Sequence, residues 1–216
     1  MTTRMKLYTH PLSPACRNVI VSAACLGIPL DTHVVDAQAG EHRTPEYAKL
    51  NPNALFPVLQ DGDFVLWESN AITQYLASKE PGNTLLPRDE RSRADIARWQ
   101  FWEQAHWSPA CRPYLWENFF KPLLGQGEPS QDELQKAEEK FDRCSRVLDS
   151  HLAGCRWLVG DNLTLADIAV ASPLMYLQQA RLPLDQFANI RGWFGRIESL
   201  PAWRDSAPHV QERPRA

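Results

Sequence analysis

The chain has 216 residues, of which 44% are apolar and 23% charged, and its formal net charge is −3. A chain of this length can bury the cores of two small domains. Its Lys and Arg residues are scattered among acidic residues, so no basic stripe marks a nucleic-acid partner. No apolar run approaches the roughly 18 residues needed to span a bilayer, and the N-terminal residues do not form the apolar core of a secretory signal. We therefore expect a cytoplasmic protein with no membrane partner.

The five cysteines are odd in number and show no paired CxxC spacing. This pattern predicts neither a disulfide framework nor a structural metal site. We expect most of these thiols to be small buried apolar groups.

Residues 5–9 are expected to form a short strand, which two prolines, Pro11 and Pro14, separate from a helix. Apolar residues from Cys16 onward follow helical spacing, and Gly27 ends that helix. Residues 30–35 alternate in the manner of a second strand. This order predicts two parallel strands joined by a crossover helix.

Thr44 and Pro45 have the residue types of a helix N-cap and first helical position, and that helix is expected to end near residue 50. Short strands are expected at residues 57–60 and 64–66 around Asp61-Gly62, a strong hairpin signal. A further helix is expected at residues 68–79. The elements from residue 5 to residue 79 therefore form the order β-α-β-α-β-β-α.

Turn-forming residues at 81–89 predict a linker, and residues 90–216 are expected to form an all-helical domain. Its expected helices are 91–107 with a continuation to 120, 131–152 and 187–200, followed by a proline-punctuated tail at 201–216. Thr164 and Asp167 have the spacing of a capping box, in which the acid hydrogen-bonds back to the N-cap residue. We expect both to be structural.

Four segments in this order resemble the cytosolic glutathione transferase superfamily, over nearly the whole chain. They are Ser13-Pro-Ala-Cys16-Arg17, Asn51-Pro52 with Phe56-Pro57-Val58-Leu59, Glu68-Ser69-Asn70-Ala71-Ile72, and Gly160-Asp161 with Leu163-Thr164-Leu165-Ala166-Asp167-Ile168. The resemblance implies a thioredoxin-like, glutathione-binding domain at residues 1–80 and a helical second domain. It also implies a bacterial-looking, serine-dependent enzyme of detoxification that acts as a homodimer.

Ser13 precedes a helix, whose unpaired N–H groups and positive dipole end favour an anion. From the residues alone, a serine at this place is more often a simple N-cap. The resemblance favours the second reading, in which Ser13 stabilises the glutathione thiolate as the catalytic residue. Tyr8 and Cys16 are the alternatives, although Cys16 belongs to the apolar face of the helix. Arg17 could add positive charge, but such a residue is more often solvated.

The resemblance also implies the residues that hold glutathione. Pro57 is expected to follow a cis peptide bond as a structural residue, and the backbone of Val58 is expected to pair with the cysteinyl part. Glu68 would take the ammonium of the γ-glutamyl end, and Ser69 its carboxylate. The alternative for this pair is an ordinary serine beside a first-turn acid of a helix.

His42 lies where related proteins contact the glycine carboxylate, although a lone histidine there is more often a solvated surface group. Leu55 departs from the family pattern, because many relatives carry Lys or Gln for this carboxylate. Asn70 stands where Arg is frequent, although Asn is common there too. Leu55 is the more telling change.

Trp102, His106 and Tyr114 belong to an aromatic stretch that suits an apolar electrophile between the domains. The alternative for most of these rings is helix core and dimer interface. We expect an enzyme that conjugates the glutathione thiolate to an apolar electrophile, with glutathione as co-substrate and no metal. Two other functions on this fold are a glutathione-dependent isomerase, lyase or dehalogenase, and a non-catalytic binding protein.

Overall fold

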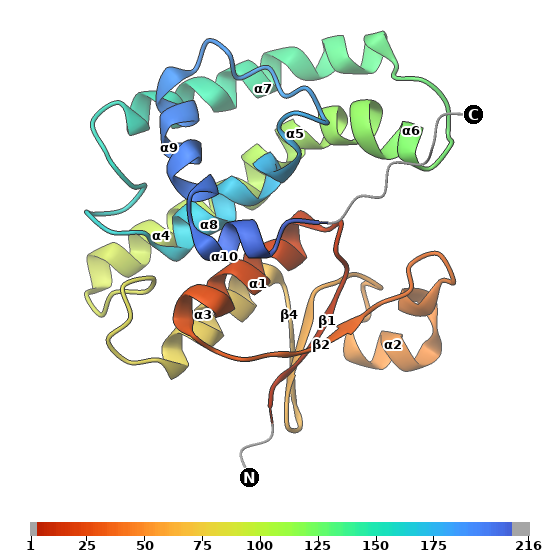
Figure 1. The fold of residues 1–216 in the computed structure, drawn as a ribbon, viewed down its shortest axis with the longest axis vertical. Helices are drawn as coiled ribbons and strands as arrows, with labels where there is room; N and C mark the ends of the chain where they lie inside the picture. Colours follow the sequence, from red (N-terminus) through yellow and green to blue (C-terminus); the bar gives the residue numbers. More distant parts are fainter. Residues whose placement is uncertain (1–3, 209–216) are drawn as a thin grey trace. The chain divides into compact units, whose positions relative to one another are not determined.

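The computed structural model describes residues 4–208 (Figure 1). It divides into two compact units: residues 84–200 form one, and the rest of the described chain forms the other. The predicted helical domain therefore ends earlier than expected. Helix α10 (Pro201–Asp205) groups with the N-terminal unit because it packs against the first helix of that unit. Residues 209–216 of the predicted tail lie outside the described residues.

The N-terminal unit contains a four-stranded sheet in the order β2-β1-β3-β4. Its strands are β1 (Lys6–Thr9), β2 (Asp31–Val34), β3 (Val58–Asp61) and β4 (Phe64–Trp67). Strands β1 and β2 are parallel, whereas β3 runs antiparallel to both β1 and β4. The predicted thioredoxin-like order is confirmed. The hairpin loop consists of Gly62 and Asp63, one residue later than predicted, and the φ of 63° at Gly62 favours glycine.

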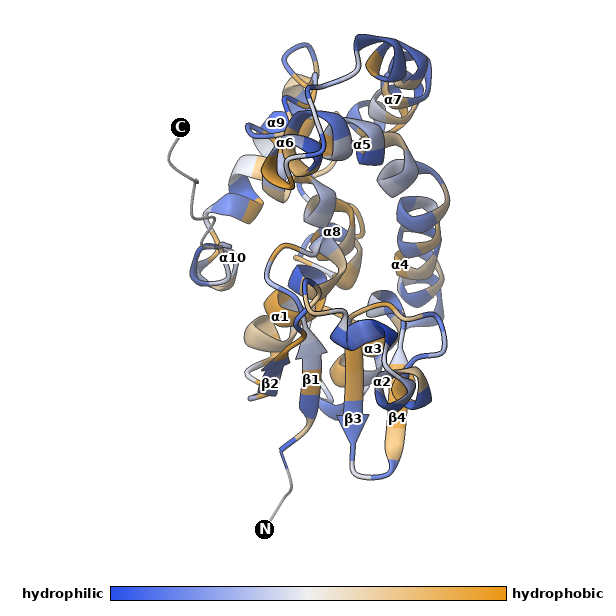
Figure 2. Ribbon diagram, turned by 90° about the vertical axis from the view of Figure 1, so that its right-hand side faces the viewer, coloured by the Kyte–Doolittle hydropathy of each residue, from blue (hydrophilic) through white to orange (hydrophobic). Residues whose placement is uncertain are grey.

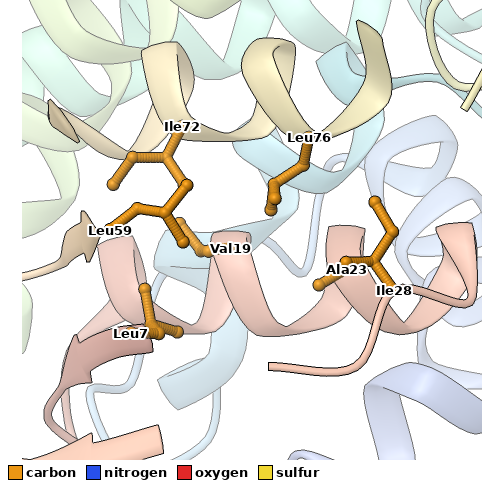
Figure 3. Packing of buried hydrophobic residues seen from close by; sticks show 7 residues of the cluster. All are labelled: Leu7, Val19, Ala23, Ile28, Leu59, Ile72 and Leu76. Carbon is orange, nitrogen blue, oxygen red and sulfur yellow. The ribbon is translucent and has the colours of Figure 1, made fainter. Parts of the chain in front are cut away.

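Two helices cover one face of this sheet, α1 (Pro14–Leu26) and α3 (Ser69–Lys79). Figure 3 shows the cluster that they bury with β1 and β3, formed by Leu7, Val19, Ala23, Ile28, Leu59, Ile72 and Leu76. Strand side chains alternate between faces, so Tyr8 and Val58 lie on the opposite side. There they pack with Val35 and with Tyr47 of α2 (Pro45–Leu50). The first helical turn of α1 therefore begins at the edge of a well-packed core.

None of residues 84–200 lies in a strand, as predicted for the second domain. Its helices are α4 (Glu90–Trp102), α5 (Ser108–Leu115), α6 (Lys121–Leu123), α7 (Gln131–Leu152), α8 (Leu165–Ala171) and α9 (Ala188–Glu198). Two short 3₁₀ segments complete the two units, η1 (Glu41–Arg43) and η4 (Ser172–Tyr176). Orange and blue residues alternate around these helices in Figure 2, as expected for helices with one buried side.

The chain from α4 to α6 is one continuous helical run with two π-helical segments, η2 (Glu103–Trp107) and η3 (Trp116–Phe120). Each π segment ends two residues before a proline, Pro109 or Pro122. A proline in a helix lacks its N–H and clashes with the carbonyl four residues earlier, and a π turn accommodates such a break. The predicted continuous helix is therefore present, with local widening at the prolines.

Asp167 is a fully buried acid near the start of α8. Its carboxylate accepts hydrogen bonds from the N–H and the hydroxyl of Thr164 at 2.9 and 3.0 Å. It also accepts from the Leu158 N–H and from Trp193 Nε1, each at 2.9 Å. Burial raises the pKa of Asp167, and these hydrogen bonds oppose that rise. Thr164 is the N-cap, as predicted, and Asp167 joins three segments of the helical unit.

Candidate active site

Ser13 is the N-cap of α1, with extended backbone geometry. Its Oγ accepts a hydrogen bond from the Cys16 N–H at 3.3 Å. A hydroxyl that accepts one hydrogen bond still has its own hydrogen to donate. The N-cap role and the predicted thiolate role of Ser13 are therefore compatible.

Cys16 is fully buried at the same end of α1, as predicted. Its Sγ accepts a hydrogen bond from the His10 N–H at 3.3 Å. Burial raises the pKa of the Cys16 thiol, and the nearby Ser13 and Thr9 hydroxyls together with the His10 N–H only partly oppose that rise. Such a thiol is a poor nucleophile, because the reactive form is the thiolate.

Tyr8 lies in the middle of the sheet, on the face that α2 covers. Its hydroxyl donates to Gln60 Oε1 at 3.4 Å, and its ring contacts the rings of His33 and Tyr47 edge-on. The Tyr8 side chain thus contacts residues of β2, β3 and α2. Among the three candidates, Ser13 alone combines partial exposure with a place at the helix N-terminus.

The Phe56–Pro57 peptide bond is cis, as predicted. Two side chains hold the loop before it: the Tyr47 hydroxyl and Asn51 Nδ2 both donate to the carbonyl of Leu55, at 3.1 and 2.8 Å. The side chain of Leu55 itself is 60% exposed. The loop before Pro57 therefore presents an apolar side chain to solvent at this position.

Val58, whose backbone is predicted to pair with glutathione, lies within the sheet. Val58 is the first residue of β3, the strand that lies between β1 and β4, and it pairs with Tyr8 on one side and Trp67 on the other. Its backbone is therefore directed at a neighbouring strand. Phe56 lies just outside the sheet, on the other side of Pro57.

Glu68 and Ser69 stand at the start of α3. Glu68 is the exposed N-cap, with a φ of 74°, a conformation that non-glycine residues rarely adopt. Ser69, the first residue of the helix, is buried. In the next position, Asn70 Oδ1 accepts a hydrogen bond from Asn18 Nδ2 of α1 at 2.9 Å. This bond links the first turns of the two helices that carry Ser13 and Ser69.

His10 is a residue of this region that the sequence interpretation missed. Its ring stacks on Phe56 with 5.0 Å between centroids, and His42 of η1 approaches the same ring edge-on at 6.1 Å. Burial lowers the pKa of His10, the nearby His42 lowers it further, and Asp36 opposes this shift. Its place directly after β1 was the available signal. Two imidazoles therefore lie against Phe56 in the loop before Pro57, and the Ser13 N–H donates to the His10 carbonyl at 3.0 Å.

His42 Nδ1 is buried and has no hydrogen-bond partner among residues 4–208. A buried polar atom without a partner is unusual in a folded protein. The residue as a whole is half-buried, so other atoms of the His42 ring remain accessible.

Arg17 is not the solvated residue that we expect from the sequence, because only 5% of its surface is exposed. Its Nη2 donates to the Trp203 carbonyl at 2.6 Å, and its Nε donates to Ser206 Oγ at 3.3 Å. The guanidinium also lies 3.9 Å from the centroid of the Trp203 ring. Arg17 therefore attaches α10 to α1.

The three residues predicted to line an electrophile pocket have different surroundings within the helical unit. Trp102 lines a pocket of about 220 Å³ that Arg98, Trp99, Val147 and His151 also line. Tyr114 is buried against Phe141, with 5.0 Å between ring centroids. His106 is exposed in η2. Tyr114 therefore serves the core of this unit, which was the alternative for these rings.

Within the described part of the chain, no three His, Cys, Asp or Glu side chains are arranged to hold a metal ion. No described helix combines the length and the apolar character needed to cross a membrane.

Comparisons with known proteins agree with this arrangement. The N-terminal domain of glutathione S-transferase matches residues 3–78, and its C-terminal domain matches residues 98–201. A glutathione S-transferase of Hyoscyamus muticus is 31% identical, over 96% of this chain and 99% of its own length. Glutathione S-transferase 3 of Zea mays is 35% identical, over 95% of this chain and 94% of its own length.

A solved structure of glutathione S-transferase-I bound with lactoylglutathione superimposes with a TM-score of 0.85. It is 28% identical and covers 95% of this chain and 99% of its own. The two curated relatives are plant proteins, so they give no support to the predicted bacterial-looking type. Both domains of the family match this chain, and the two curated relatives match it over almost their whole length. The chain therefore belongs to the glutathione S-transferase family.

Proposed function

We propose that this protein is a serine-dependent glutathione transferase, in which Ser13 stabilises the thiolate of glutathione. The carrying observation is the position of Ser13 at the N-terminus of α1, with a hydroxyl hydrogen left to donate. The thiolate attacks an electrophilic carbon. A carbon–sulfur bond forms as the leaving group departs with its electron pair, and the thiol proton has already passed to solvent.

The energies of this role are adequate. A thiol of pKa about 8.5 is only a few per cent ionised at neutral pH, and lowering that pKa by about two units takes roughly 2.7 kcal/mol. A hydrogen bond to a charged group contributes about 1.5–3 kcal/mol. A helix N-terminus adds about 0.3–1 kcal/mol. One serine at this position is therefore sufficient.

The rest of the glutathione molecule has matching groups in the same unit. Glu68 takes the ammonium of the γ-glutamyl end, and Ser69 takes its carboxylate at the start of α3. His42, whose Nδ1 is unpaired among the described residues, takes the glycine carboxylate. The backbone of Phe56 replaces Val58 as the partner of the cysteinyl part, because Val58 is used by the sheet.

The electrophile is a small apolar molecule, and Trp102 and His106 are the residues of the aromatic stretch that remain candidates for contacting it. Tyr114 contributes through the core that supports them. We further propose that the enzyme is a cytosolic homodimer, which is typical of the family.

Three variants test the role of Ser13 against its competitors: Ser13→Ala, Tyr8→Phe and Cys16→Ala. Turnover with a model aryl halide should fall roughly 10- to 100-fold in Ser13→Ala, the loss of one charge-assisted hydrogen bond. Glutathione binding by titration calorimetry should change much less. Tyr8→Phe and Cys16→Ala should keep most of the turnover.

Ser13→Thr is the matched control, because it keeps both the hydroxyl and an N-cap oxygen. Unchanged turnover in Ser13→Ala would overturn the assignment of Ser13. A large loss in Tyr8→Phe alone would move the role to Tyr8. The absence of measurable glutathione binding by the unmodified protein would instead favour a non-catalytic protein of this fold.

A further inference from the structure

Arg17 is a buried cation that makes several contacts with one short element, α10, and the residue after it. Its guanidinium meets a carbonyl, a hydroxyl and an aromatic ring, and all three belong to Trp203 and Ser206 at the end of α10. The last carbonyls of a helix have no partner inside the helix. Ser206 Oγ also donates to the Trp203 carbonyl at 3.0 Å. Arg17 and Ser206 together therefore cap the C-terminal end of α10.

The backbone of Arg17 is also hydrogen-bonded to the backbone of Ser13. The Arg17 N–H donates to the Ser13 carbonyl at 3.0 Å, which is the first hydrogen bond of α1. The next residue, Asn18, is bonded to Asn70 of α3. The first turn of α1 is thus fixed on one side by α10, through Arg17, and on the other by α3, through Asn18. Figure 1 shows α10 beside α1.

We propose that Arg17 is a positioning residue, through which α10 holds the first turn of α1 and so orients the Ser13 hydroxyl. The inference rests on the proposed role of Ser13. A catalytic group that moves by about 1 Å can lose a large part of its effect, even when the altered contact is remote. In this proposal α10, which the sequence predicts to be part of a tail, helps to position the residue that stabilises the thiolate.

A second explanation is possible for any effect of Arg17, namely that its charge alone favours the thiolate. The two explanations differ for Arg17→Lys and for Trp203→Leu. Lysine keeps the charge but lacks the planar guanidinium that makes several directed bonds and stacks on a ring. Trp203→Leu keeps Arg17 intact and removes the ring against which it stacks. If position matters, both variants lose function.

The experiment measures the pKa of the thiol in the glutathione complex by thiolate absorbance, together with kcat and KM. We expect Arg17→Lys and Trp203→Leu each to raise the thiol pKa by about one unit and to lower kcat at neutral pH roughly tenfold, because the thiolate fraction falls. KM for glutathione should change less than about threefold. The double variant should lose no more than either single variant, since both break the same contact. Arg204→Lys, an exposed arginine of α10, is the control.

An unchanged thiol pKa in Arg17→Lys would overturn the inference. So would normal kinetics in Trp203→Leu, which would assign the effect to charge, or additive losses in the double variant. If Arg17→Lys does not fold, Trp203→Leu and Ser206→Ala test the same contact with Arg17 in place. Ser13→Ala separates the two proposals. If the thiol pKa is raised in Ser13→Ala but unchanged in Arg17→Lys, only the positioning role of Arg17 is overturned. A normal pKa in Ser13→Ala overturns the proposed function and, with it, any action of Arg17 through Ser13.

Discussion

Asp167 of the helical unit and Ser13 and His42 of the N-terminal unit differ in how many hydrogen bonds their side chains make. In the helical unit, the Asp167 carboxylate accepts four hydrogen bonds from three other residues. In the N-terminal unit, Ser13 Oγ accepts a single bond, and His42 Nδ1 has no partner within residues 4–208. A polar group whose hydrogen bonds are complete contributes to stability, whereas one with remaining capacity can bind a ligand. On this criterion Asp167 is a structural acid, whereas Ser13 keeps hydrogen-bonding capacity for the ligand that we propose.

The largest expected effect is the loss of stability when the structural acid Asp167 is replaced. Asp167→Ala leaves the N–H groups of Leu158, Thr164 and Trp193 without their acceptor in a buried place. We expect the free energy of unfolding to fall by about 3–5 kcal/mol, measured by urea denaturation. Asp161→Ala, an exposed acid in the preceding loop, is the control and should change stability by less than about 0.5 kcal/mol.

If Asp167→Ala changed the free energy of unfolding as little as the control does, the four hydrogen bonds would contribute little net stability. The folded fraction of the variant should still bind glutathione, because Asp167 lies in the other unit from Ser13 and His42. Loss of binding beyond the unfolded fraction would contradict the division into a structural and a binding region.

Much of the fold follows from local signals in the sequence. Thr44 and Pro45 begin α2 as predicted, and Gly27 ends α1 in the left-handed conformation that glycine favours. Apolar spacing placed α1, α3 and α7 within one or two residues. Each of these signals depends on neighbours a few residues away, which a single sequence displays.

The parts that the sequence could not predict depend on distant partners. The role of Val58 depends on where β3 begins, which is fixed by pairing with Tyr8 and Trp67. The burial of Arg17 depends on Trp203, which lies 186 positions further along the chain. Without knowledge of such pairs, a tail and a solvated arginine are the reasonable predictions. The candidate site was thus identified by residue type and corrected by contacts.

A smaller effect is expected at Leu55, an apolar residue of the proposed binding region in the N-terminal unit. Leu55→Lys restores a cation at the exposed position before Pro57. An exposed ion pair contributes about 0.2–1 kcal/mol, so KM for glutathione should fall by up to about fivefold, with kcat unchanged. Steady-state kinetics at low and high salt measure this, since salt should weaken the gain.

Leu124→Lys supplies the same charge at an exposed leucine of the helical unit and should leave KM unchanged. An equal change in both variants would assign the gain to net charge. No change in Leu55→Lys would mean that the glycine carboxylate lies away from this loop.

The smallest expected effect concerns pH and His10, whose pKa is lowered from 6.5, first by burial and then by the nearby His42, with Asp36 opposing. Its Nδ1 accepts a hydrogen bond from the Leu12 N–H at 3.3 Å, which requires this nitrogen to be unprotonated. Below a pH of about 6.5 the unfolded chain therefore binds a proton that the folded chain does not. Stability should fall as the pH decreases from about 6.5 toward the lowered pKa of the folded state.

His10→Asn keeps a side-chain acceptor near Nδ1 and removes the titrating group, so this part of the acid sensitivity should disappear. Urea unfolding at about pH 7.5 and about pH 5.5 measures the difference for the unmodified protein, for His10→Asn and for His106→Asn, an exposed control. The same loss of stability on acidification in the unmodified protein and in His10→Asn would show that another group is responsible. Because the His10 ring stacks on Phe56, its protonation is expected to act on the loop before Pro57.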